Sequence, residues 1–314
     1  MFKKILVGVD VYVEAQHAFE DALAIAQKTG AFLHLMHVFS WDAAYDHCLA
    51  MLHSQLEHEH SSLEIQIDTD PIVQCMISRF PGYEQAEILK LCLAEAKKSG
   101  VRADIETRHG NPARILCDAA RSGKADLIAV GHRDQKHWKN RLESGERRLG
   151  SISGNVIEHA PCSVLIAHRY IEDHVAMGAL SGMQQILVSV DESSTSQIVV
   201  KEALDLAKAV SASVTLLHVR SPLEGDSLSE TLESYANKAT ALDVPLIVKQ
   251  LDIESRQSIG QVICEFAEDQ RSDLVLMGRR KLSKLQELVL GSVSRYVVNH
   301  ASCAVLIVHP YEDG

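Results

Sequence analysis

The sequence predicts an α/β protein made of two tandem modules, each a doubly wound, five-stranded parallel sheet. The main observation is an internal repeat: LGSISGNVIEHAPCSVLIAH (149–168) and LGSVSRYVVNHASCAVLIVH (290–309) share twelve of twenty positions, and KKILVGVD (3–10) matches QQILVSVD (184–191). In both copies short, almost wholly apolar runs alternate with helical patterns. Such runs are typical of parallel strands that are covered by helices on both faces.

The elements of the first copy follow in order from these patterns. A helix after the first strand has one apolar face and ends near Gly30; its face is formed by Ala18, Phe19, Ala22, Leu23 and Ala26. Further helices are expected over 112–121 and from about Ser151. The five strands are expected at ILVGV (5–9), FLHLMHVF (32–39), ADIET (103–107), DLIAVG (126–131) and SVLIAH (163–168). The second copy repeats them as ILVSV (186–190), VTLLHV (214–219), LIVKQL (246–251), DLVLMG (273–278) and AVLIVH (304–309).

The offset between the copies gives the domain organisation. It is 181 at the first two strands, 147 at the fourth and 141 at the closing phrase, so the first copy carries extra residues. We expect a first module at 1–168 with an inserted helical segment near 40–82, a linker at 169–184 and a second module at 185–314. Each module is long enough to bury its own core.

Composition excludes several classes of protein. The chain is 46% hydrophobic and 23% charged, with a formal net charge of −11, which argues against a general binder of nucleic acid or of anionic membranes. No apolar run is long enough for a signal peptide or a membrane span. The seven cysteines include no CxxC pair and are interpreted as small buried residues in a reducing compartment, so a cytoplasmic location is expected.

The ligand site of a doubly wound sheet is expected beyond the carboxyl ends of its strands. The segment after the fourth strand is basic in both copies, with a net charge of +3 over 131–148 and again over 278–292. The basic residues of the segment 278–292 include Arg279, Arg280 and Lys281. Each segment ends in Gly-Ser at an expected helix start, where backbone N–H groups and the helix dipole suit a phosphate. The alternative is an ordinary helix N-cap that follows a solvated loop.

The chain resembles the universal stress protein family in its tandem form. The resemblance rests on ILVGVD and ILVSVDESS, on GNPARIL (110–116) and on the Gly-Ser-x-Ser closing phrase, and it covers both copies apart from the insertions and the linker. It implies the strand order 3-2-1-4-5, with edge strands that pair between two modules. It also implies ATP or AMP as the ligand, with Mg²⁺ as a companion of ATP. The nucleotide would lie on a Gly, two residues, Gly, nine residues, Gly-Ser pattern, with the opening Asp beside it and the adenine near the ends of the first two strands.

The second copy matches this pattern better than the first. It keeps the spacing from Gly278 to Gly291, with Lys281 in place of the middle glycine and Gln257 where the first copy has Gly110. The first copy has Asp134 in place of the middle glycine and fifteen residues instead of nine. The favoured binding residues are therefore Asp191, Val219, Gly278, Arg280, Lys281, Gly291, Ser292 and Ser294. Their less favoured counterparts in the first copy are Asp10, Val38, Gly131, Gly150 and Ser151.

No catalytic residue is expected. The chain has no GxxxxGK[ST] loop, no GxGxxG after a strand and no GxSxG elbow, and slow hydrolysis of ATP would lack an evident base. His53, Glu57 and His60 share one face of an expected helix in the insertion. This face is the solvent-exposed side of an ordinary amphipathic helix, so no metal site is expected.

Two classes of function remain open. One is a regulatory protein of the stress response that senses an adenine nucleotide. The other is a stress-response scaffold that binds no nucleotide and acts through protein partners. In both, the apolar closing strands SVLIAH and AVLIVH need cover, so we expect them to pair across an intrachain pseudo-twofold axis. A further homodimer is plausible but not required.

Overall fold

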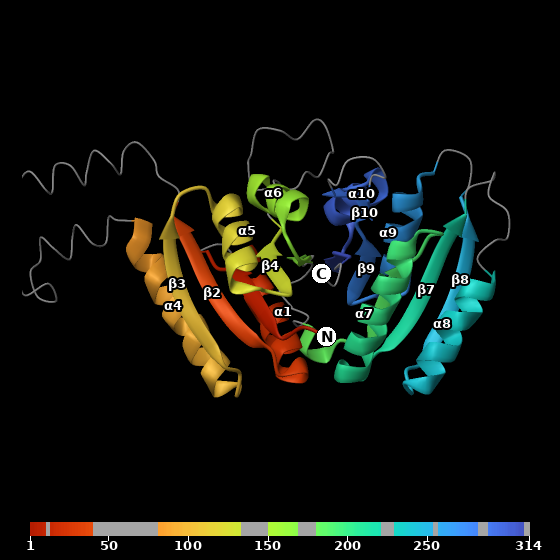
Figure 1. Cartoon of the computed structure of the whole chain (residues 1–314), viewed down its shortest axis with the longest axis horizontal. Coiled ribbons are helices and arrows are strands. Elements are labelled where there is room, and N and C mark those ends of the chain that lie inside the picture. Colours follow the sequence, from red (N-terminus) through yellow and green to blue (C-terminus); the bar gives the residue numbers. More distant parts are fainter. Residues whose placement is uncertain are drawn as a thin grey trace, which may run out of the picture.

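The structure is a computed structural model of the whole chain (Figure 1). It describes residues 1–10, 13–39, 81–132, 150–168, 180–220, 229–253, 257–281 and 288–310. His53, Glu57 and His60 lie outside these residues, as do the first basic segment from residue 133 to 149 and most of the expected linker.

The first module alternates strands with helices as the apolar pattern predicts. Its elements are β1 (Lys4–Gly8), α1 (Val13–Thr29), β2 (Phe32–Phe39), α4 (Pro81–Lys98), β3 (Ala103–His109), α5 (Pro112–Gly123), β4 (Leu127–Gly131), α6 (Ser151–His159) and β5 (Ser163–Ala167). Gly30 has φ +72° directly after α1, a backbone conformation that favours glycine and ends the helix.

The second module repeats this order after a 3₁₀ turn, η2 (Leu180–Gly182). Its elements are β6 (Gln185–Ser189), α7 (Ser194–Val210), β7 (Ser213–Arg220), α8 (Ser229–Ala241), β8 (Leu246–Asp252), α9 (Ile259–Asp269), β9 (Leu274–Gly278), β10 (Arg280–Lys281), β11 (Leu288–Val289), α10 (Ser292–His300) and β12 (Ala304–Val308). The short antiparallel pair β10–β11 was not anticipated and folds the second basic segment back on itself.

The two modules form one sheet of ten strands, in the order β3-β2-β1-β4-β5-β12-β9-β6-β7-β8. The expected order 3-2-1-4-5 is thus present in the first half, and the second half mirrors it. The strands are parallel within each module, and β5 pairs with β12 in the antiparallel sense, with Leu165 opposite Leu306. The expected pairing of the closing strands is confirmed, and it makes the complete sheet mixed rather than parallel.

In both modules an equivalent aspartate, just before the fourth strand, binds the backbone at the start of the first strand. Asp126 Oδ2 accepts hydrogen bonds from the backbone N–H groups of residues 3 and 4, at 2.7 and 2.8 Å. Asp273 Oδ2 accepts from those of residues 184 and 185, at 2.8 and 2.9 Å. The amino-terminal end of the fourth strand of each module is therefore tied by a side chain to the start of the first.

Helices cover both faces of the ten-stranded sheet (Figure 1). Side chains of α1, α4, α7 and α8 share one apolar core with one face, whereas α5, α6, α9 and α10 share a second core with the other. Alternate residues of a strand enter opposite cores: Ile5 and Val7 enter the first, and Leu6 enters the second. This explains the nearly unbroken apolar runs of the central strands.

The start of the second module is anchored on the first. The backbone N–H of Leu180 donates to the buried carboxylate of Asp21 in α1, at 3.1 Å, and the side chains of Leu180 and Met183 are buried in the same core as α1. Among the described residues, no helix is both long and apolar enough to cross a bilayer.

Helix α4 was not assigned from the sequence. Its buried positions Leu89, Cys92 and Ala96 follow helical spacing, but most other positions are polar, and the helix lies next to the insertion. It packs on β2 and β3, so it covers the outer end of the sheet.

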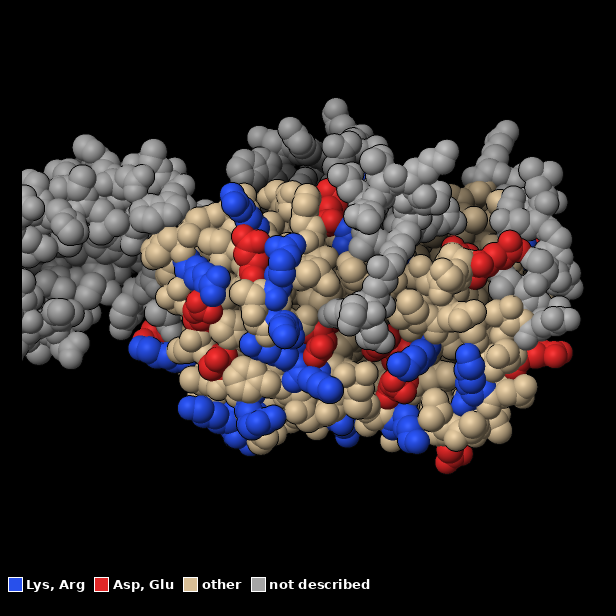
Figure 2. Space-filling model, viewed as in Figure 1, with Lys and Arg blue, Asp and Glu red and all other residues tan. Residues whose placement is uncertain are grey.

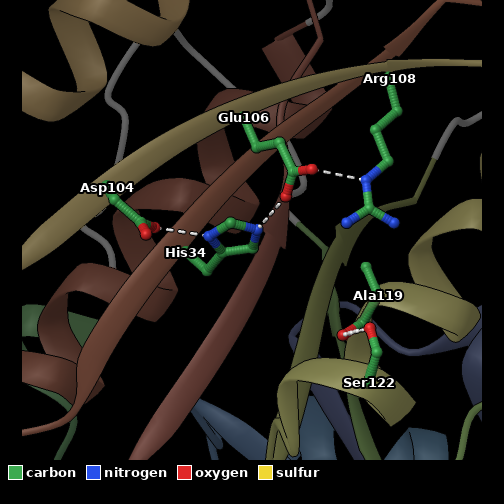
Figure 3. A network of polar contacts seen from close by, with 6 residues as sticks. All are labelled: His34, Asp104, Glu106, Arg108, Ala119 and Ser122. Carbon is green, nitrogen blue, oxygen red and sulfur yellow. Dashed lines mark hydrogen bonds and ion pairs between the residues drawn. The ribbon is translucent and has the colours of Figure 1, made fainter.

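The outer strand β3 carries a polar network on its α5 side (Figure 3). His34 in β2 lies with Nδ1 2.5 Å from Asp104 Oδ1 and Nε2 2.9 Å from Glu106 Oε2. The Nε of Arg108 donates to the other oxygen of Glu106 at 2.6 Å. The hydrogen bond from Arg108 is the main reason why the pKa of Glu106 lies below its usual value. Charged side chains on an edge strand also discourage pairing with another chain.

We predict that replacing Leu306 at the β5–β12 seam by Ala will destabilise the protein strongly. Both Leu165 and Leu306 are fully buried, so the change leaves a cavity, which typically costs about 2–5 kcal/mol. Urea unfolding measures the change in midpoint. Leu91→Ala is the control, because Leu91 is 68% exposed, and equal losses in the two variants would contradict the assigned role of the seam.

We also predict that Glu106 stabilises the fold in a pH-dependent way. Because its pKa is lower in the folded chain than the ordinary value of 4.5, its contribution is present above pH 4.5 and is lost as pH falls through the folded value. The difference in urea midpoint between the wild type and Glu106→Gln should therefore shrink in acid. In an Arg108→Gln background the difference should be smaller and less dependent on pH. A difference that does not change with pH would count against this account.

Candidate functional site

Strand register places three of the favoured residues at adjoining strand ends. In β6, Ser189 lies opposite Leu217 and Val188 lies opposite Leu276. Two residues further along, Asp191 therefore comes beside Val219 at the end of β7, and Val190 comes beside Gly278 at the end of β9. This is the carboxyl edge of the parallel strands, where ligands bind in doubly wound sheets.

Asp191 organises the turn into α7. Its Oδ1 accepts hydrogen bonds from the N–H and hydroxyl of Ser193, at 3.0 and 2.5 Å, and from the hydroxyl of Ser196 at 2.9 Å. Ser196 Oγ in turn accepts from the N–H of Asp191 at 2.9 Å. Ser193, which lies in the ESS after Asp191, and Ser196, two residues beyond that stretch, are thus the donors that hold this carboxylate at the strand end.

Val219 and Gly278 have clear packing roles. The side chain of Val219 is buried in the core shared by α9 and α10, which leaves its backbone as the part that faces the strand ends. A Cβ on Gly278 would come 2.6 Å from Cγ2 of Thr195 and 3.2 Å from Val199. Glycine is therefore required here because α7 lies close to the end of β9, a reason that sequence spacing alone does not reveal.

Gly291 and Ser292 form the start of α10. Gly291 is the N-cap, with φ −63° and ψ 161°, and Ser292 is the first helical residue. The buried hydroxyl of Ser294 donates to the carbonyl of Gly278 at 3.3 Å. This bond joins the helix start to the end of β9, which brings Gly278 and Gly291 into one site.

The start of α6 is the counterpart in the first module. Gly150 is its N-cap with similar angles, φ −58° and ψ 153°, and Ser151 is its first residue. Ser153 takes the place of Ser294, but it donates to the carbonyl of Gly150 at 3.5 Å instead of to the fourth strand.

The two kinds of helix start differ in their capping. In α5 and α9, the side chains of Asn111 and Ser258 accept a hydrogen bond from an N–H group in the first turn. In α6 and α10 no such side-chain bond is made within the described part of the chain, since the N-cap is glycine. The backbone N–H groups at the start of α6 and α10 are thus suited to an external acceptor, as are those of α7, whose N-cap Ser193 also makes no side-chain cap bond.

Arg279 corrects the sequence interpretation of the second basic segment. Its side chain is only 3% exposed, and it donates to the carbonyls of Glu158 and Ala160 at the end of α6, the latter at 3.3 Å. It therefore contributes to the contact between the modules and not to a clamp for phosphate. Burial lowers its pKa, and the nearby carboxylate of Glu158 opposes this shift.

Arg280 and Lys281 remain as cations of this segment, and both lie in β10, opposite Val289 and Leu288 of β11. On the face drawn in Figure 2, the described Lys and Arg side chains are interspersed with Asp and Glu and do not form one basic surface.

In the first module, register brings three of the less favoured residues together in the same way. Gly8 lies opposite Met36 and Val7 lies opposite Ala129, so Asp10 comes beside Val38, and Val9 beside Gly131. Residues 133–149 lie outside the described residues.

Two histidines that occur at equivalent strand positions have a packing role in both modules. The Nδ1 of His37 lies 2.7 Å from the carbonyl of Val9, and that of His218 lies 3.1 Å from the carbonyl of Val190. Both rings are buried and tie the end of the second strand to the end of the first. The repetition of these histidines is thus explained without a ligand.

Of the five described cysteines, Cys92, Cys117 and Cys162 are buried, and Cys264 and Cys303 are half-buried. Burial raises the pKa of Cys117 to about 11 and that of Cys162 and Cys303 to about 12, so their thiols stay protonated at neutral pH. None of the five described cysteines forms a disulfide, and no cluster of three or more potential metal ligands occurs within the described residues.

The comparisons agree with this architecture. The family model for the universal stress protein family matches residues 1–168 and again residues 182–309. A universal stress protein of Mycolicibacterium smegmatis is 25% identical over 98% of this chain and 97% of its own length. One from Synechocystis is 38% identical, over 25% of this chain and 69% of its own.

Solved structures share the fold across both modules. A universal stress protein from Archaeoglobus fulgidus covers 98% of each chain with a TM-score of 0.68 at 16% identity. A putative universal stress protein from Pseudomonas aeruginosa covers 98% of this chain and 94% of its own, with a TM-score of 0.60 at 15% identity. With both halves matched by the family model and joined in one sheet, the chain belongs to the universal stress protein family, in a tandem form.

Proposed function

We propose that this universal stress protein is a regulatory protein of the stress response that binds an adenine nucleotide, ATP or AMP, in its second module. The observation that carries the proposal is the contrast between helix starts: α9 is capped by its own serine, whereas α10 begins at a glycine and leaves its first N–H groups to an outside acceptor. A nucleotide phosphate is such an acceptor.

The surroundings of α10 support a phosphate in this place. Ser294 ties the helix start to Gly278, and the chain between them carries Arg280 and Lys281. The hydroxyl of Ser292, which is exposed, can donate to the same phosphate. A lysine attracts phosphate as a point charge, so Lys281 in place of the middle motif glycine is electrostatically compatible with the ligand.

Asp191 would lie on the nucleoside side of the site, since strand register sets it beside Val219 and away from the start of α10. A carboxylate accepts hydrogen bonds from ribose hydroxyls, which gives it a role there that it could not have beside phosphate. The nucleotide acts in this proposal as a regulatory ligand, and no catalytic residue is assigned.

We predict that Gly291→Val will abolish ATP binding. The backbone angles of Gly291 are open to any residue, so the change should leave α10 intact and act by placing a branched side chain between the helix N–H groups and the phosphate. Isothermal titration of ATP into the purified protein measures the loss. Gly150→Val is the matched control at the start of α6 and should matter less. If the control proves the more damaging change, the site belongs in the first module.

We predict that Arg280→Gln with Lys281→Gln will weaken ATP more than adenosine. Polyphosphate gains from each nearby cation, whereas a neutral nucleoside does not. Affinity for ATP should also fall with added salt, because exposed charges are screened over about 8–10 Å at 0.1–0.15 M ionic strength. Arg279 is left unchanged because its side chain is buried between the modules.

Comparative titrations with ATP and adenosine at two salt concentrations test this prediction. Equal losses of both ligands would mean that the double change damages the fold of the site. No change in either would mean that these cations are a solvated surface. A wild-type chain that binds no adenine nucleotide at all would leave the scaffold that acts through protein partners as the function.

A further inference from the structure

The side chain of Arg279 crosses from the second module into the first. Its backbone directly follows β9, and its N–H donates to the carbonyl of Val308 in the same module at 3.2 Å. Its guanidinium, by contrast, donates through Nη1 to the carbonyl of Ala160 and through Nη2 to that of Glu158. One residue thus joins the end of β9 to the last turn of α6.

Helix physics makes this contact favourable. The last carbonyls of an α-helix have no partner within the helix, and the carboxyl end carries a partial negative charge. A guanidinium provides two donors at fixed spacing together with a full positive charge. Because the side chain is almost completely buried, loss of these bonds would leave a desolvated cation, so its position is strongly held.

The first module does not repeat this residue. His132 is the equivalent of Arg279, since both directly follow the final glycine of the fourth strand. The buried ring of His132 stacks on that of His168, with centroids 4.1 Å apart. The backbone N–H of His132 donates to the carbonyl of Ala167 at 3.1 Å, just as the backbone N–H of Arg279 donates to the carbonyl of Val308. The backbone contact is therefore present in both modules, whereas the side chains differ: the ring of His132 stacks on His168, and the guanidinium of Arg279 donates to carbonyls at the end of α6.

The place of Arg279 in the sequence connects it to the proposed site. It lies between Gly278, whose carbonyl accepts from Ser294, and the two cations of β10. Its backbone is held by β12 and its side chain by α6, so the direction in which the chain leaves β9 is set from both modules.

We propose that Arg279 is a positioning residue that makes the proposed nucleotide site of the second module depend on α6 of the first. The proposal rests on the proposed function for its ligand. Arg279 does not touch the nucleotide; it fixes the β10–β11 segment that carries Arg280 and Lys281. The first module then serves as part of the scaffold of the second module's site.

The test compares Arg279→Gln, Arg279→Lys and Arg295→Gln in the full chain. Arg295 is the matched control: its Nη2 lies 3.1 Å from Glu158 Oε1 across the same seam, but the pair is exposed and such pairs contribute little. Two quantities are measured, namely hydrogen exchange of peptides that cover 280–289 and 151–160, and the affinities for ATP and adenosine by titration.

We expect Arg279→Gln to speed exchange in both peptides at least tenfold and to weaken ATP about tenfold, with a smaller loss for adenosine. Arg279→Lys, which keeps the charge and one donor to the helix end, should restore much of both effects. Arg295→Gln should resemble the wild type in both measurements. Rescue by lysine separates positioning from a simple loss of packing.

Three results would overturn the proposal. The first is exchange in 280–289 that does not differ between Arg279→Gln and Arg295→Gln. The second is faster exchange throughout the chain without rescue by lysine, which indicates general destabilisation. The third is faster local exchange with unchanged ATP affinity. If the wild type binds no ATP, the proposed function fails, and the exchange measurement still decides whether Arg279 holds β10–β11.

Discussion

The antiparallel pairing of β5 with β12 is the contact on which the rest of the structure depends. Each of these strands would otherwise be a fully apolar edge, with unpaired backbone groups on one side and buried side chains on both faces. Their pairing turns two sheets into one and lets two cores run across the boundary between the modules. It also brings α6 and the end of β9 close enough for Arg279 to span them. The asymmetry at the candidate site arises because the sequence places Arg279 in the second module and His132 at the equivalent position of the first.

Within that frame, the candidate site consists mainly of backbone. Helix α10 offers N–H groups at a glycine start, and Ser294 keeps this start against the carbonyl of Gly278. Gly278 itself is small because Thr195 occupies the space where its side chain would stand. The close approach of α7 thus explains the glycine, and the carbonyl of the same residue is the acceptor for Ser294 at the start of α10.

Much of this fold follows from the sequence, because a repeat of apolar strands and amphipathic helices determines both the layers and the number of strands. The helix over 112–121 and the closing strands were expected within a few residues of their observed bounds. Helix α4 was missed although the spacing of Leu89, Cys92 and Ala96 is helical, because it lies next to the insertion, where the offset between the two copies changes. The buried position of Arg279 could not be predicted from its place in the basic segment. Net charge along a segment does not say where each side chain points, and its partners are backbone carbonyls about 120 residues away. Those carbonyls have no signature in the amino-acid sequence. The assignment of individual binding residues to the nucleotide stays a prediction.

The covalent link between the modules changes what substitution can do at their boundary. In a homodimer every replacement appears twice, related by the twofold axis, so a residue that suits one side must also be tolerated on the other. In this chain the position after the fourth strand is histidine in one half and arginine in the other, and each has its own neighbours. The two halves of a tandem chain can therefore take different roles. One half can bind a ligand, and the other can supply contacts that stabilise the first.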